Sequence, residues 1–233
     1  MRPKSAMFYL EDVDETSEQL LHLLENHLDK NRDSTDLNNC LQKYALDSIA
    51  IMFLGFHVGV LEGSEEGIKL AKSLETVLNS LWQLTVMPDW MLKLTGVHSS
   101  YVKETIFVFN TCNRMISEAI AKHNKDGSLE GSVLLKLIKR CGPDSQLPIV
   151  MGIDALTAGI DTTTNSLNIL LYLLANNPDK QDKLYDEIIT VVGKDGKLNE
   201  AKLSRIRYLK VRSPISIIQQ QMFCMYSDAH IIY

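Results

Sequence analysis

Apolar residues recur along most of this chain at spacings of three and four positions, which is the pattern of helices that bury one face. Runs that alternate apolar and polar residues, as β-strands do, are hard to find. A first helix is predicted over about 12–30, where Leu20 and Leu24 lie on one stripe. A second is predicted from Asp36, a residue that favours helix N-termini, to Gly55. The pattern as a whole indicates an all-α protein.

Helix-ending residues divide the rest of the chain. The same reasoning predicts a third helix through Leu70, Leu74, Val77, Leu81 and Leu84 that stops at Pro88, a fourth from about Val102 to Asp126-Gly127, a short fifth over about 131–140, a helix over about 178–192 that ends at Gly193, and a last one over about 199–210.

The segment between about residues 146 and 177 differs from the others. It contains no helix-breaking residue beyond its first turn except Gly152 and Gly159, and apolar residues occupy all its faces. We therefore expect one long helix, buried on every side, that runs through the middle of the fold and contacts most other elements. Helices average about 10–14 residues, so this one is unusually long.

The chain changes character after Lys210. The segment 211–233 holds a run of three glutamines and no sustained periodicity. We interpret residues 1–210 as one domain and 211–233 as a tail that is foreign to it and disordered.

Composition excludes several classes of protein. There are 24 basic and 29 acidic residues, a net charge of −5, without a Lys/Arg cluster, so nucleic acid is not expected as a partner. The four cysteines show no Cys-x-x-Cys spacing and no glycosylation sequon occurs, which favours an intracellular protein. No targeting segment or membrane span is predicted. His22 and His27 lie five positions apart, which does not suit two metal ligands on one helix face, and we predict no metal site there.

One part of the long helix is unusual for a buried element: Ala158-Gly159-Ile160-Asp161-Thr162-Thr163. A buried aspartate is costly unless it is paired, and successive threonines disfavour a helix. Small residues would let a large planar ligand approach the backbone, and a threonine hydroxyl that bonds a helical carbonyl can widen the helix locally. A ligand site explains these features. A satisfied polar network around Asp161 is the structural alternative.

This segment resembles the central helix of the cytochrome P450 family, the haem-thiolate monooxygenases. The family's motif is Ala/Gly-Gly-x-Asp/Glu-Thr-Thr/Ser, and the segment 158–163 matches it at each position. The sequence that follows, NSLNILLYLLANNPDKQDKLYDEI, is similar to the family's passage into its next helix. The resemblance covers about residues 11–210, the middle of the family's fold, and is strongest to the animal mitochondrial branch.

The resemblance implies a helical core around the long helix, with haem as the cofactor. Ala158, Gly159 and Thr162 would bind the haem face on which dioxygen sits. Asp161 and Thr162 would be the catalytic acid–alcohol pair, since bound dioxygen must receive protons before its O–O bond can break. The substrate would be an apolar small molecule.

The residues that hold haem from the opposite side in this family are not found. Neither the Phe-x-x-Gly-x-Arg-x-Cys-x-Gly loop nor the Glu-x-x-Arg pair occurs in the sequence. Cys224 lacks flanking Gly or Arg residues, and we interpret it as an incidental thiol. Trp82 and Trp90 lack the Arg, four positions on, that binds a haem propionate. We therefore expect a fragment without the proximal half of the fold and inactive alone, so a truncated non-catalytic isoform or a helical binding fragment is the alternative function.

The resemblance also indicates partners and a location. A ferredoxin-type protein would donate electrons, and the protein would lie at the matrix side of the mitochondrial inner membrane, with the endoplasmic reticulum as the alternative. Trp82, Met87, Trp90, Phe107 and Phe109 are expected in the core by default. The resemblance places the same region at the roof of the substrate site and in peripheral contact with the membrane.

Overall fold

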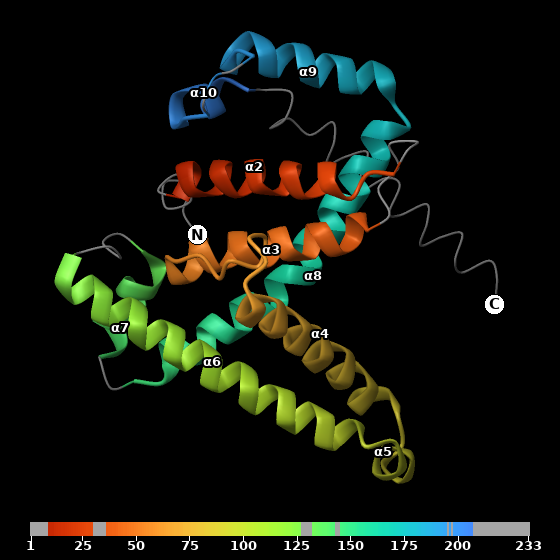
Figure 1. Cartoon of the computed structure of the whole chain (residues 1–233), viewed down its shortest axis with the longest axis vertical. Coiled ribbons are helices and arrows are strands. Elements are labelled where there is room, and N and C mark those ends of the chain that lie inside the picture. The colour runs from red at the N-terminus through yellow and green to blue at the C-terminus, as the bar shows by residue number, and fades with distance from the viewer. Residues whose placement is uncertain are drawn as a thin grey trace. The chain divides into compact units, whose positions relative to one another are not determined.

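The computed structural model of the chain describes residues 9–29, 36–126, 132–142, 145–194, 196 and 198–206. In these ranges the elements are helices, with no β-strand among them, and this confirms the all-α prediction (Figure 1). The chain forms two compact units, residues 1–163 and 164–233. The long helix α8, Leu147–Ala175, contributes to both.

The first unit holds most of the helices. They are α2 (Leu10–Asn26), α3 (Leu37–Leu54), α4 (Glu65–Val86), α5 (Asp89–Thr95), α6 (Val97–Asp126), α7 (Val133–Cys141) and the first half of α8. Helix α2 packs along α3, and α4 packs along α6 in a hairpin whose far end is α5 (Figure 1).

A single apolar core joins these helices. It contains Leu46, Ala50 and Leu54 of α3, Leu70 and Leu74 of α4, Val108, Cys112 and Ile116 of α6, Leu134 and Leu135 of α7, and Leu156 and Ile160 of α8. In α3, α4, α6 and α8 these residues lie four positions apart, as the sequence pattern predicts.

Polar contacts fix α4 against α6 around this core. The Ser73 hydroxyl donates to Glu104 Oε2 at 2.7 Å. The Arg114 guanidinium of α6 pairs with Glu66 of α4 and with Glu118 one turn further along its own helix. These ion pairs are partly exposed, so the buried stripe rather than the charges accounts for most of the stability of the hairpin.

Local signals place the ends of α3 as predicted. Asp36 is the N-cap residue, although its carboxylate accepts a hydrogen bond from the Asn39 side chain at 2.7 Å instead of from the backbone. Gly55 ends the helix with φ = 80°, a left-handed conformation that glycine adopts without strain.

The second unit consists of the end of α8, then α9 (Pro178–Val192) and α10 (Glu200–Arg205). Asn177-Pro178 starts α9 and Gly193 ends it, as predicted. The Asn199 side chain caps α10 by accepting from the Lys202 amide at 2.9 Å, and the Lys202 ammonium donates to the Val192 carbonyl at 3.1 Å. The tail 211–233, including Cys224, lies outside the described residues.

Two predictions about the fold are wrong. Helix α5 was not expected. It holds only seven residues between Pro88 and Gly96, which is too few for a periodic pattern to be recognised. Helix α8 has nearly the predicted bounds, but it is not buried on every side. Gly152, Leu156 and Ile160 form a buried stripe, whereas the side that holds Asp154 and Ala158 is exposed. Side chains of α3 and α6 pack against the side of α8 that holds the buried stripe.

Candidate functional site on helix α8

Three of the predicted site residues lie on the exposed side of α8. Ala158, Asp161 and Thr162 are exposed and share one face of the helix, since residues three and four apart lie together. The Thr162 hydroxyl donates to the Ala158 carbonyl at 2.9 Å and approaches the Gly159 carbonyl at 3.4 Å. This is the hydrogen bond to the preceding turn that the sequence predicts. Asp161 is not buried, so its placement in an apolar sequence carries no burial cost.

Gly159 faces another direction. A Cβ atom built on it would lie 2.8 Å from Cγ1 and 2.9 Å from Cδ1 of Ile49 on α3, closer than real Cβ contacts. Two turns earlier, a Cβ on Gly152 would lie 3.0 Å from Leu54 Cδ2. The two glycines therefore allow α8 to pack tightly against α3, and any contact of Gly159 with a ligand would be made by its backbone.

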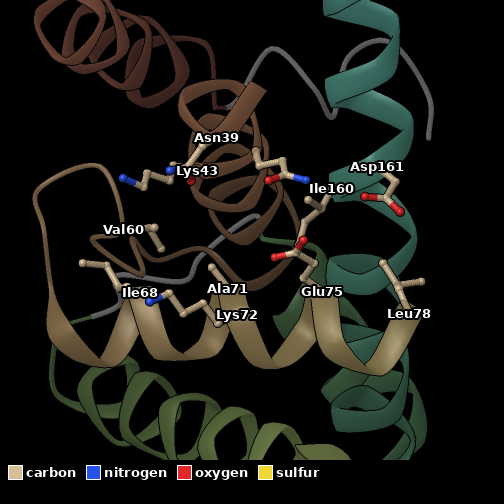
Figure 2. Close-up of a pocket in the computed structure, with 11 residues that line it drawn as sticks. Asn39, Lys43, Val60, Ile68, Ala71, Lys72, Glu75, Leu78, Ile160 and Asp161 are labelled. Atoms are coloured by element: carbon tan, nitrogen blue, oxygen red, sulfur yellow. The ribbon is translucent and has the colours of Figure 1, made fainter. Parts of the chain in front are cut away.

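A pocket opens between α3, α4 and α8 beside Asp161 (Figure 2). Its volume is about 210 Å³. It is lined by Asn39, Gln42 and Lys43 of α3, Val60 of the following loop, Ile68, Ala71, Lys72, Glu75 and Leu78 of α4, and Ile160 and Asp161 of α8. Of these residues the sequence analysis had singled out only Asp161. Nothing in the spacing of the others predicts that three separate helices bring them together.

A buried carboxylate holds the loop that forms one wall of this pocket. Asp47 is 1% exposed, and it accepts backbone N–H bonds from Val58 and Gly59 on Oδ1 at 3.1 and 2.9 Å and from Leu61 on Oδ2 at 3.0 Å. Burial raises the pKa of the Asp47 carboxyl, and the backbone donors and the nearby His57 oppose that rise. Sequence reasoning missed this residue. A lone acid within the apolar run of α3 was the available signal.

Cys40 and Cys112 are not suited to bind a metal. Cys40 and Cys112 are buried, and burial raises the pKa of the Cys112 thiol to about 12, which keeps it protonated. In the described ranges no group of three or more His, Cys, Asp and Glu residues could hold a metal ion.

The prediction that this region belongs to the core is wrong for the two tryptophans. Trp82 is 72% exposed and Trp90 63%, whereas Met87, Phe107 and Phe109 are half-buried. The Lys69 ammonium lies over the ring of Phe107, 4.3 Å from the ring centroid. Further exposed apolar residues gather at the same end of the α4–α6 hairpin: Leu81, Val86, Leu94, Val102 and Ile106. We call these five residues and the two tryptophans the hairpin tip. No helix in the described ranges is long and apolar enough to cross a membrane.

Comparisons with known proteins identify the family of this chain. The family model described as Cytochrome P450 matches residues 1–211. The "Probable cytochrome P450 12a5, mitochondrial" of Drosophila melanogaster is 28% identical over 90% of this chain and 41% of its own length, and "Cytochrome P450 CYP12A2" of Musca domestica is 27% identical over the same shares.

A solved structure shows the same fold. The crystal structure of the cytochrome P450DA heme domain superposes with a TM-score of 0.70 and 15% identity, over 89% of this chain and 44% of that one. The chain thus spans about two fifths of the relatives that it matches. Since the family model matches residues 1–211, which include all the described helices, the chain belongs to the cytochrome P450 family.

Proposed function

We propose that this chain forms the oxygen-binding side of a haem-dependent monooxygenase that inserts one atom of dioxygen into an apolar small molecule. The observation that carries the proposal is the exposed face of α8, where Ala158, Asp161 and Thr162 lie together in the family's motif. Family membership supports haem as the cofactor.

The residues on this face suit a flat, largely apolar ligand. Ala158 presents only a methyl group, and the Thr162 hydroxyl is held against the helix by the Ala158 carbonyl, so little projects from the surface between them. Ala158, Thr162 and the backbone at Gly159 would contact the haem. Neither Cys40 nor Cys112 would supply the thiolate ligand, because both are buried in the core.

When bound, haem supplies the iron that activates dioxygen. Thr162 would hold its hydroxyl on the face that contacts the ligand, where the oxygen can accept a hydrogen bond from a proton donor while the O–H donates to the Ala158 carbonyl. Asp161 is exposed to solvent one residue away, which suits a group that takes protons from water and passes them on.

The test uses a full-length version completed with the haem-binding half. Thr162→Ala should leave haem incorporation unchanged, as judged by the shifted Soret band of the reduced carbon monoxide complex. It should lower product formed per electron consumed by about tenfold and release peroxide, because the hydroxyl acts after oxygen binds. Product, NAD(P)H consumption and peroxide are measured together.

Thr157→Ala is the matched control, because the Thr157 hydroxyl makes the same bond to its preceding turn, 2.7 Å from the Ile153 carbonyl. Unchanged coupling in Thr162→Ala, or equal uncoupling in both variants, would contradict the role of Thr162. Residues 1–233 alone should give no shifted Soret band. This outcome favours the alternative that the chain by itself is a non-catalytic isoform or a helical binding fragment, since the Cys loop and the Glu-x-x-Arg pair do not occur in the sequence.

The names of similar proteins support a proposal about the location of this chain. Two of the insect proteins most similar to this chain carry "mitochondrial" in their names. We propose a mitochondrial protein at the matrix side of the inner membrane, reduced by a ferredoxin-type protein. The exposed apolar hairpin tip supports peripheral contact with that membrane.

A further inference from the structure

Apart from Asp161, the pocket between α3, α4 and α8 is lined by residues that the proposed oxygen chemistry does not use. Its floor is apolar, with Val60 and Ile160 buried and Ile68 half-buried. Charged side chains stand only at its rim. A pocket of about 210 Å³ is below the usual range of drug-sized sites, about 300–1,000 Å³, so it suits a small ligand.

The rim charges are separated by sign. Figure 2 shows the ammonium groups of Lys43 and Lys72 at one end of the pocket, on either side of Val60 and Ile68. The carboxylates of Glu75 and Asp161 lie toward the other end, near Ile160. Two positive and two negative groups therefore flank one apolar floor.

None of these four groups satisfies its charge within the described part of the chain. The ion pairs there involve His22 with Glu25 and Arg114 with Glu66 and Glu118, and no side-chain hydrogen bond reaches Lys43, Lys72, Glu75 or Asp161. Pockets bind small molecules through an apolar lining and a few convergent polar groups, and complementary charge fixes the orientation of the ligand.

We infer that this pocket binds a small zwitterion with an apolar middle. The ligand's anionic end would meet Lys43 and Lys72, its cationic end would meet Glu75 and Asp161, and its methylene groups would lie on Val60, Ile68 and Ile160. A ligand with one charge would satisfy only one end. The inference does not rest on haem binding, because Val60, Ile68 and three of the four charges lie outside the motif on α8.

The experiment titrates residues 1–233 with ε-aminocaproate and follows amide resonances by NMR. Caproate and hexylamine serve as single-charge controls of the same length, and glycine as a zwitterion without a spacer. We expect ε-aminocaproate to shift resonances of the pocket residues with a Kd of about 1 mM, and each control to bind about tenfold more weakly. Added salt should weaken binding, because exposed charges are screened.

Variants then assign the two ends. Lys72→Met and Glu75→Gln keep the length of each side chain and should each weaken ε-aminocaproate about tenfold, with Lys72→Met leaving hexylamine binding unchanged. Lys103→Met removes an exposed lysine of α6 away from the pocket and should have no effect. Circular dichroism verifies that each variant keeps its helices.

Several outcomes would overturn the inference. Equal binding of caproate would indicate a simple anion site at the lysines, and equal binding of hexylamine a cation site at the carboxylates. Resonance shifts spread away from the pocket, or no binding of any probe, would show that the pocket has no such ligand. Loss of coupling in Thr162→Ala can occur with any of these results, so the two proposals fail separately.

Discussion

The carboxylate of Asp47 links α3 to the loop that precedes α4. Its two oxygens satisfy three backbone N–H groups that would otherwise be buried without an acceptor. The loop residue Val60 is thereby held at the floor of the pocket. One side chain thus determines where α4 begins relative to α3.

Replacement of Asp47 should destabilise the first unit. Asp47→Asn keeps an oxygen for Val58 and Gly59 but turns an amide N–H toward the Leu61 N–H, which costs about 1–3 kcal/mol in the free energy of unfolding. Asp47→Ala leaves three buried donors unpaired and should cost more. Urea unfolding followed by circular dichroism measures both. Asp154→Asn, on the exposed side of α8, is the control and should change stability by about 0.5 kcal/mol or less.

The pH dependence of stability checks the same residue. Since burial raises the pKa of Asp47 above its ordinary value of 3.8, the folded chain holds this proton more tightly than the unfolded chain. The contribution of this group to the free energy of unfolding is therefore greatest below pH 3.8 and decreases as pH rises through the raised pKa. Asp47→Asn should lack that decrease, and an unchanged profile would contradict the assignment.

At the scale of residues, local motifs could be predicted and tertiary clusters could not. The segment 158–163 could be recognised because its residue types are unusual for a buried helix. The hydrogen bond from Thr162 to the preceding turn could be predicted because both partners lie on the same helix. Lys43, Lys72 and Glu75 are ordinary polar positions of two amphipathic helices. Their significance arises only when the helices pack.

Helix α8 depends on its glycines for its position. Gly159 lies against Ile49 of α3 with no room for a methyl group, and Gly152 lies near the flexible end of Leu54. Each glycine lowers helix propensity by about 1 kcal/mol relative to alanine, and it allows the close packing of α8 against α3.

Gly159→Ala should lower stability by about 1–3 kcal/mol despite the better propensity of alanine, because its Cβ would overlap Ile49. Gly152→Ala should be nearly neutral, since only the end of the Leu54 side chain must move. Thermal unfolding followed by circular dichroism provides the comparison. In an Ile49→Ala background, Gly159→Ala should lower the free energy of unfolding by less. An equal loss of stability in both backgrounds would show that Ile49 does not cause the steric overlap.

Helix order and most helix ends could be predicted because Asp36, Gly55, Pro88, Pro178 and Gly193 act locally. The burial of α8 could not be predicted. Apolar residues show which faces of a helix can be buried, but they do not show which neighbouring elements cover those faces. The seven-residue α5 is too short for periodicity to distinguish it from a loop.

At the scale of the whole molecule, the hairpin tip is an exposed apolar surface. Trp82, Trp90 and Leu94 are each more than 60% exposed, at 72%, 63% and 79%. An apolar patch of this kind on a water-facing surface marks a contact with a membrane or another protein, and otherwise promotes aggregation.

The double variant Trp82→Ser/Trp90→Ser should bind neutral phosphatidylcholine vesicles about tenfold more weakly than the unmodified chain, since the loss of about 1.4 kcal/mol of apolar contact corresponds to a tenfold change in binding. Flotation of the protein with the vesicles measures the bound fraction. Tyr185→Ser removes an aromatic residue of α9 that is 59% exposed and serves as the control. Equal losses in both variants would indicate unspecific adhesion.

The position of the tryptophans also determines what optical methods can detect in this protein. Trp82 and Trp90 are the two tryptophans of the chain, and both indole rings are already in contact with water in the folded state. Their emission should therefore change little when the core around Leu46 and Leu156 unfolds. The same emission should shift to shorter wavelength when the tip enters an apolar phase. Tryptophan fluorescence therefore reports contact of the hairpin tip with an apolar phase. Unfolding of this chain has to be followed by another method.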